Sequence, residues 1–271
     1  MKTTISLALA LVALSAAAGA ARGQEFRTDR TADAPAGARL QLDSQFGNIT
    51  VRGWDRATVR VQARHTADVE VEIDVRGPLV QVGADRPGKT VEYVVTVPAE
   101  MPIEIDLIQG SVDVSGVRSE MRIQSVNGSI TVRGGIGSID LGSVQGSITL
   151  EGASGDVHAE TVNGRIQLRG IESGRVTAET LNGAVSYAGA IRNDGWYRFS
   201  THNGPIDLTI PAGAGAVFTA STFNGTLETA FPVQLREAKE GKEFSFTLGT
   251  GGARIDLESF NGTMTIRRAG Q

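Results

Sequence analysis

Four ionisable side chains form a candidate cation site, provided that residues one repeat of about 18 positions apart lie side by side. They are His158, Glu160, Glu179 and Asp140. Carboxylate and imidazole ligands suit a weakly held divalent cation. The simpler interpretation of the same residues is a solvated surface with ordinary polar side chains. We therefore assign no metal, cofactor-binding or catalytic residue from the sequence.

Other catalytic chemistry has little support. The absence of cysteine excludes thiolate catalysis, thiolate metal sites and disulfides. No nucleophile-elbow, phosphate-loop or zinc signature is present. Carbohydrate-active enzymes need paired carboxylates in a groove, and with two tryptophans the chain offers no aromatic stripe for sugars. We expect no catalytic turnover and keep a carbohydrate-active enzyme as an alternative.

Charge and the N-terminal residues indicate an exported protein that does not bind nucleic acid. The formal net charge is −4. Nucleic-acid binding requires a basic surface, so this charge argues against it. After Met1-Lys2, an apolar run from Ile5 to Ala18 is too short to cross a bilayer, and small residues follow it. We expect a signal peptide over residues 1–23, no later transmembrane segment, and a periplasmic or extracellular location.

An internal repeat dominates the rest of the chain. An Asn-Gly or Gln-Gly pair recurs, and successive glycines are separated by 18, 18, 18, 19, 21, 21 and 37 residues. The glycines of these pairs are Gly110, Gly128, Gly146, Gly164, Gly183, Gly204, Gly225 and Gly262, with Gly47 as an earlier, degenerate member. Alternating apolar residues flank each pair, which is typical of strands with one buried face. The pattern predicts an all-β, single-domain β-solenoid of 18–21 residues per repeat, or rung, with rungs stacked at about 4.8 Å.

Each corner of this repeat has its own residue types. Asparagine tolerates the left-handed conformation and glycine adopts it freely, so we expect a positive φ at corner glycines such as Gly164. Two positions before each Asn or Gln stands a hydroxyl residue that parity directs inward: Ser125, Ser143, Thr161, Thr180, Thr201, Thr222 and Ser259. We expect these hydroxyls to bond corner backbone groups, and the corner amides to bond from rung to rung. Three corner asparagines, with Asn48, also match the glycosylation pattern, but the repeat itself explains them.

The residue directly before each Asn or Gln is apolar or aromatic. These residues are Ile108, Val126, Val144, Val162, Leu181, His202, Phe223 and Phe260. Strict alternation directs them outward, so either the corner bends them back into the core or the surface displays an apolar ridge. We favour the first interpretation, because an exposed ridge is an association site. On the outer face of the strands, Arg133, Glu151 and Arg169 should form a ladder of alternating charge, worth about 0–1 kcal/mol per exposed pair.

The repeat is less regular toward both ends. We expect a flexible lead-in over residues 24–37 and the solenoid domain over residues 38–268, whose longer rungs from residue 39 to about 107 form an N-terminal cap. Residues 235–242 predict a charged loop, and the strand 244–248 then returns to the body.

These motifs resemble the bacterial putative-adhesin family of exported β-solenoid proteins. The resemblance rests on residues 46–55, residues 95–99, the Asn-Gly rungs and the ending 248–257 followed by Asn261-Gly262, and it covers about residues 38–268. It implies a β-helix-like fold and an adhesin-like envelope role, and it supplies no catalytic residues.

The sequence as a whole predicts a non-catalytic binding or scaffold module at the cell envelope, without a cofactor. Its partner is unknown: an envelope polymer, a glycan and a protein surface all remain open, and self-association is possible. A carbohydrate-active β-helix enzyme and an end-to-end polymerising structural protein are the alternatives. A carboxylate pair in a deep groove favours the enzyme, and uncapped terminal rungs favour the polymer.

Overall fold

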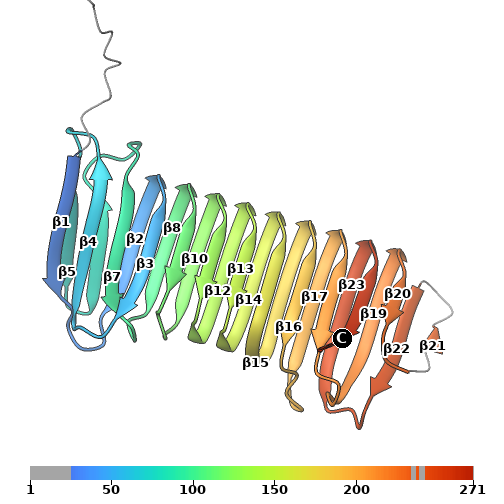
Figure 1. Ribbon diagram of the computed structural model, residues 1–271. Coiled ribbons are helices and arrows are strands. Elements are labelled where there is room, and N and C mark those ends of the chain that lie inside the picture. The colour runs from blue at the N-terminus through green and yellow to red at the C-terminus, as the bar shows by residue number, and fades with distance from the viewer. Residues whose placement is uncertain (1–25, 233–235, 238–241, 271) are drawn as a thin grey trace, which may run out of the picture.

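The computed structural model describes residues 26–232, 236–237 and 242–270, and it is all-β. Within these ranges there are 24 strands and no helix, and therefore no helix long and apolar enough to cross a membrane. The expected signal peptide and most of the expected charged loop lie outside the described residues. Figure 1 shows strands of successive repeats lying side by side along one axis.

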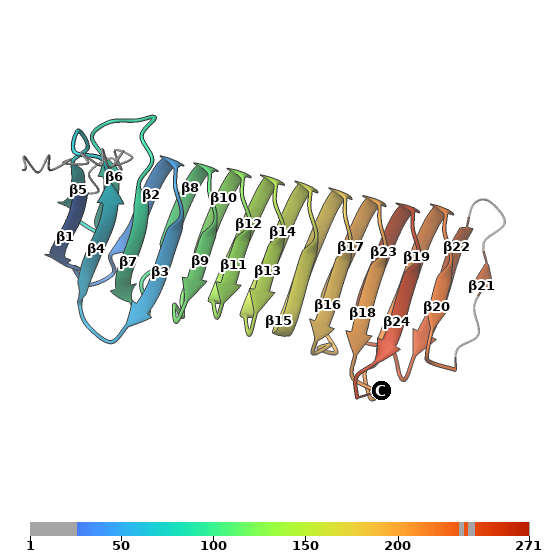
Figure 2. The same ribbon diagram turned by 45° about the horizontal axis from the view of Figure 1, so that its top comes forward.

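The strands form two ladders, which we call A and B. In spatial order, ladder A contains β1 (Phe26–Asp33), β4 (Thr58–His65), β7 (Glu92–Pro98), β3 (Ile49–Trp54), β9 (Val112–Ser115), β11 (Ile130–Arg133), β13 (Ile148–Glu151), the first part of β15 (Ile166–Asn182), β16 (Val185–Gly189), β18 (Ile206–Ile210), β24 (Met264–Arg268) and β20 (Leu227–Thr229). Figure 2 shows the strands of ladder A in this order.

Ladder B runs beside it. In spatial order it contains β5 (Val71–Arg76), β6 (Leu79–Ala84), β2 (Arg39–Phe46), β8 (Ile103–Gln109), β10 (Met121–Asn127), β12 (Ile136–Gln145), β14 (Ser154–Asn163), the second part of β15, β17 (Trp196–Asn203), β23 (Ala253–Asn261), β19 (Ala216–Asn224), β22 (Lys242–Leu248) and β21 (Arg236–Glu237). A rung consists of one ladder B strand, a corner glycine and one ladder A strand.

Residues one repeat apart lie side by side, as the spacing predicts. In the regular body the pairing is parallel, with Ile130 opposite Ile148 and Thr161 opposite Thr180. The apolar residues of both ladders point into a shared core, where Ile123 and Leu150 have no exposed surface. The alternating apolar pattern therefore marks the buried faces correctly.

The charge ladder on the outer face also follows the predicted register. Glu151 lies between Arg133 and Arg169, with nitrogen–oxygen distances of 3.7 and 3.9 Å. Arg133 makes a closer contact of 3.0 Å with Asp113 on the rung before. All four side chains keep substantial exposure, so each pair contributes only about 0–1 kcal/mol.

The N-terminal segment differs from the expected lead-in. Within residues 24–37, residues 26–33 form β1, which pairs antiparallel with β4 from Phe26 opposite His65 to Asp33 opposite Thr58. Asp29 also accepts hydrogen bonds from the Arg60 guanidinium. The physical reason is that β4 would otherwise present an open sheet edge.

The C-terminal rungs do not follow the order of the sequence. The rung of β23 and β24 lies between the rung of β17 and β18 and the rung of β19 and β20. Strand β22 pairs antiparallel with the outer edge of β19 and covers it. The chain thus completes its last corner inside the stack rather than at its end.

Candidate functional site

The corner glycines stack closely on one another. A Cβ placed on Gly164 would lie 2.0 Å from the carbonyl oxygen of Gly146, and the other corners show the same approach. Gly110 and Gly47 have φ values of 140° and 111°, but Gly164 is not among the positive-φ residues. The expected left-handed conformation is therefore wrong for Gly164, where contact between backbones excludes a side chain.

The corner hydroxyls point inward and bond backbone, as predicted. Thr161 donates to the carbonyl of Gly146 at 3.0 Å and Ser143 to that of Gly128 at 3.1 Å. Thr180, Thr201 and Ser259 make the equivalent bonds. The buried hydroxyls of Ser125 and Thr222 have no partner among the described residues.

The corner amides also bond from rung to rung. The Nδ2 atoms of Asn182, Asn203 and Asn261 each donate to the Oδ1 atom of the preceding asparagine at 2.9 Å, and Asn163 begins this series. The predicted amide ladder is therefore confirmed over four rungs.

The corner hydroxyls with a hydrogen bond and those without one provide a matched test. We expect Thr161→Val to lower the free energy of unfolding by about 1 kcal/mol, because it removes a buried hydrogen bond. Thr222→Val removes no such bond and should change stability by less than about 0.5 kcal/mol. Urea denaturation of both variants checks this, and equal losses would contradict the assigned hydrogen bond.

The residues directly before the corner amides point outward, against the interpretation that we favoured. We call these eight residues the apolar ridge; in spatial order they are Ile108, Val126, Val144, Val162, Leu181, His202, Phe260 and Phe223. Leu181 is 49% exposed and Phe223 is 66% exposed. The reason is that each ladder B strand extends through its Asn or Gln, so the alternation of inward and outward side chains persists up to the corner.

The C-terminal end of the ridge is an aromatic stack. The rings of His202 and Phe260 are 4.6 Å apart and those of Phe260 and Phe223 are 4.9 Å apart, with interplanar angles of 11° and 6°. These residues come from β17, β23 and β19, so the inserted C-terminal rung completes the stack. They line a pocket of about 550 Å³ together with Glu179, Glu258 and Lys242 of the neighbouring surface.

A column of polar residues runs beside the ridge on ladder B, and its only charges are negative. We call it the acidic column; in spatial order it contains Asp43, Asp106, Gln124, Gly142, Glu160, Glu179, Ser200, Glu258 and Ser221. Arg198 lies between Glu179 and Glu258, at 3.1 and 3.2 Å. On its other side the ridge adjoins the uncharged corner amides.

The residues of the candidate cation site lie on adjacent rungs as predicted, but two of their carboxylates pair with arginines. Asp140 lies opposite His158, and Glu160 lies opposite Glu179. The His158 Nε2 atom is 3.8 Å from Glu160. Asp140 instead pairs with Arg122, and Glu179 pairs with Arg198. In the described part of the chain, no group of three or more His, Asp or Glu residues has the geometry to hold a metal ion.

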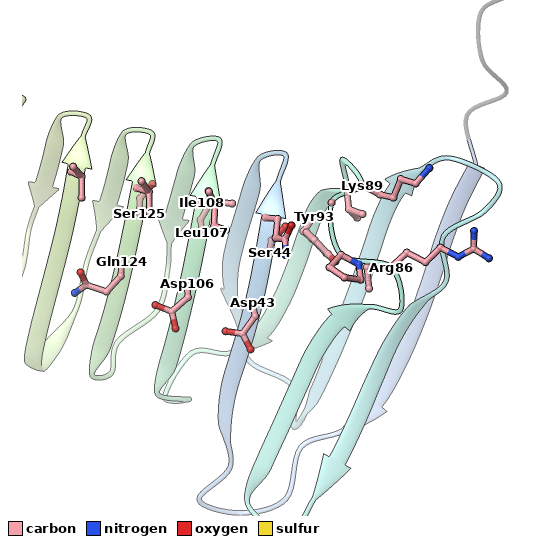
Figure 3. A pocket seen from close by; sticks show the side chains of 17 residues that line it. Asp43, Ser44, Arg86, Lys89, Tyr93, Asp106, Leu107, Ile108, Gln124 and Ser125 are labelled. Carbon is pink, nitrogen blue, oxygen red and sulfur yellow. The ribbon is translucent and has the colours of Figure 1, made fainter.

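A second pocket, of about 540 Å³, lies at the N-terminal end of the ridge. Asp43, Asp106 and Gln124 project into it from three adjacent strands (Figure 3). Ile108 and Val126 of the ridge form its apolar side. Its charged side chains therefore lie against an apolar wall.

The far wall of this pocket comes from the connection between β6 and β7, which is a loop rather than a tight corner. Arg86 and Lys89 of this connection line the pocket, together with Tyr93 of β7. Lys89 is 2.7 Å from Asp68 and Arg86 is 3.5 Å from the same carboxylate, so both cations already have a partner. The sequence repeat carries no signal for this pocket, because only the fold brings the loop over the first rungs.

Asp106 and Tyr93 both line this pocket and have shifted pKa values; burial raises the pKa of Tyr93 to about 12. Partial burial raises the pKa of the Asp106 carboxyl above its usual value, and the neighbouring charge of Asp43 raises it further. Arg122 opposes both effects. Asp106 has no hydrogen-bond or ion-pair partner among the described residues.

Comparison with known proteins identifies a likeness in fold. No family model and no curated protein matches the sequence. A solved structure of a putative adhesin from Parabacteroides distasonis ATCC 8503 is similar at a TM-score of 0.50 and 9% identity, covering 91% of this chain and 98% of that one.

Two further structures are more distant. A putative adhesin from Bacteroides fragilis NCTC 9343 has a TM-score of 0.45 and 13% identity, covering 91% of this chain and 98% of that one. A putative cell adhesion protein from Clostridium sporogenes ATCC 15579 has a TM-score of 0.28 and 12% identity, covering 90% and 100%. The chain shares its fold with the Parabacteroides putative adhesin, and the resemblance to bacterial putative adhesins is confirmed at the level of the fold.

Proposed function

We propose that residues 38–268 form a β-solenoid that acts as a non-catalytic binding or scaffold module at the bacterial cell envelope. Two parallel ladders joined by stacked corners support the solenoid. The proposal includes removal of residues 1–23 as a signal peptide and a periplasmic or extracellular location. An envelope polymer, a glycan or a protein is the partner class.

The single observation that carries this proposal is the exposed apolar ridge. Soluble proteins rarely expose a contiguous apolar surface without a binding role. Here the exposure is repeated from rung to rung between β8 and β19, with Val162 half-buried, rather than scattered. Affinity for a long partner would accumulate from rung to rung along this line.

A sedimentation experiment tests the proposal. Purified protein is mixed with envelope fractions of the producing bacterium, and the bound fraction is measured. We expect replacement of Val126 and Val144 by serine to reduce binding strongly, because both lie on the ridge. The matched control replaces Thr131 and Thr149 by serine as well. Both lie outward on ladder A of the same two rungs, so this variant should bind like the original protein. Equal binding by both variants would overturn the proposal.

A carbohydrate-active enzyme is the second candidate, because Asp43 and Asp106 place two carboxylates on adjacent rungs of one pocket. Glycoside hydrolysis uses such a pair with one raised pKa. Of the residues that the structure describes, Tyr93 is the only aromatic one that lines the pocket, and it is 2% exposed, so it offers no platform for a sugar ring. We therefore still favour the binding module.

We expect no turnover when the protein is incubated at micromolar concentration with a broad glycan panel and the products are read by mass spectrometry. Cleavage products that vanish in Asp106→Asn would make the enzyme the leading candidate. Cleavage products that vanish in His158→Ala or Glu160→Ala would also favour an enzyme, with its active site at the candidate cation site instead of the pocket. Asp113→Asn, on the outward face of ladder A, is the matched control.

The end-to-end polymer gains little support. Antiparallel strands β1, β5 and β22 lie at or next to three of the four ladder ends. Only ladder A at the C-terminal side ends, in the described residues, on a strand of the parallel body, β20.

A further inference from the structure

The two flanks of the apolar ridge differ in charge. The acidic column supplies five carboxylates and no cation on one flank, and uncharged amides form most of the other. Arg198 partly neutralises Glu179 and Glu258. Asp43, Asp106 and Glu160 form no hydrogen bond or ion pair with arginine or lysine among the described residues, although the charge of Arg122 acts on Asp106. A partner that covers the ridge therefore meets negative charge along one side only.

The spacing of the ridge narrows the partner's shape. Eight positions at about 4.8 Å span about 34 Å. One turn of an α-helix rises about 5.4 Å, whereas side chains on one face of a strand are about 6.8 Å apart. A helix of about 22 residues thus matches both the length and the period of the ridge better than an extended peptide.

We propose that the ridge binds a basic amphipathic helix of a partner protein, with the basic residues along the flank that faces the acidic column. The proposal rests on the proposed binding function and adds the chemistry of the partner. The apolar stripe of the helix packs on Val126, Val144 and their equivalents. Lysine or arginine side chains reach Asp106, which lies beside Asp43 in Figure 3, and Glu160 farther along the same column.

Synthetic helical peptides with one leucine stripe test this. Three peptides differ only on one flank, which carries lysine, glutamine or glutamate, and fluorescence anisotropy measures their affinity. We expect the lysine peptide to bind at least about tenfold more tightly than the glutamine peptide, with a preference that declines as salt increases. The glutamate peptide should bind most weakly.

Variants separate the two contributions. Val126→Ser with Val144→Ser should weaken the lysine and glutamine peptides alike. Asp106→Asn with Glu160→Gln should remove the preference for lysine and leave the glutamine peptide unchanged. A lysine peptide that fails to bind, or binds no better than the glutamine peptide, overturns this proposal. Ridge-dependent binding to envelope fractions would still uphold the proposed function in that case.

A separate observation concerns the Asn-Gly corners. In such a pair the backbone nitrogen of glycine attacks the side-chain carbonyl carbon of asparagine. A C–N bond forms to close a succinimide, the amide C–N bond breaks and ammonia leaves, and water then opens the ring to aspartate or isoaspartate. The reaction requires a free glycine N–H and a side-chain amide that can rotate.

The inner corners restrain these groups. The N–H groups of Gly164, Gly183 and Gly204 each donate to the asparagine carbonyl of the next rung at 2.9–3.0 Å. The side-chain amides of Asn163, Asn182, Asn203 and Asn261 form the amide ladder. Asn127 has no such side-chain bond, but the N–H of Gly128 is held by the Gln145 carbonyl.

The last corner lacks both restraints. Asn224 belongs to the terminal rung of β19 and β20, so no further corner stacks on it. Among the described residues, neither the Gly225 N–H nor the Asn224 side chain has a hydrogen bond. We propose that Asn224 is a site of spontaneous deamidation, which places a new carboxylate beside Phe223 at the end of the ridge.

Peptide mapping by mass spectrometry tests this on the full chain aged at mildly alkaline pH. We expect Asn224 to convert at least about tenfold faster than Asn163, Asn182 or Asn203, because held amides must first open. In denaturant all these Asn-Gly pairs should convert at similar rates. Native rates at Asn224 equal to those at the inner corners would overturn the proposal.

Discussion

Replacing Gly164 with valine should lower the free energy of unfolding by at least about 3 kcal/mol, far more than Arg165→Ala. A Cβ at this position meets the Gly146 carbonyl oxygen at 2.0 Å. That oxygen belongs to the backbone of the rung before, so no side chain can rotate away to relieve the contact. The two rungs would have to separate.

Alanine substitutions give a sharper version of this test. Gly164→Ala should lose most of the same stability, because its Cβ alone makes the contact. Gly83 lies in strand β6, and a Cβ added there would meet no atom within 4 Å, so Gly83→Ala is the matched control and should be tolerated. Urea denaturation measures both, and equal midpoints would contradict the stacked-corner geometry.

Phe199→Ala should lower the free energy of unfolding by about 3–5 kcal/mol. The Phe199 ring is fully buried and lies 5.2 Å from the ring of Tyr187. Its removal leaves a cavity in the core between the ladders, where the neighbouring rungs hold the backbone in place.

Phe223→Ala makes the same chemical change on the ridge. Phe223 is 66% exposed, so we expect a loss below about 1 kcal/mol, most of it from stacking on Phe260. Thermal unfolding of both variants checks the contrast. A large loss in Phe223→Ala would show that the ridge is structural rather than a free surface.

Much of the architecture could be predicted from the spacing of a few residue types. The Asn-Gly period placed Thr161 opposite Thr180, and strict alternation identified Ile123 and Leu150 as core residues, both in agreement with the structure. These predictions succeeded because a stacked repeat makes every neighbour a fixed number of residues away. The same local rule cannot describe strands that leave the repeat, such as β1 and β22.

The sequence predicted the ridge residues of the candidate site but not their exposure or the pocket beside them. The eight ridge residues were identified, but the bend that we expected to bury them does not occur, because the ladder B strands persist to the corner. Of the acidic column, only Glu160 and Glu179 were singled out, as part of the candidate cation site. The meeting of Asp43 and Asp106 with the β6–β7 loop in the pocket was not predictable from the period.

The sequence by itself determined the period, the inward and outward faces, and the need for glycine at each corner, because these follow from local alternation and from chemistry repeated at a constant interval. Tertiary structure alone decided which strands cover the ladder edges. It also decided that the rung of Asn261 lies between the rungs of Asn203 and Asn224. It further decided why Gly164 must be glycine. Those outcomes depend on contacts between backbones distant in the chain, for which the local residue pattern carries no signal.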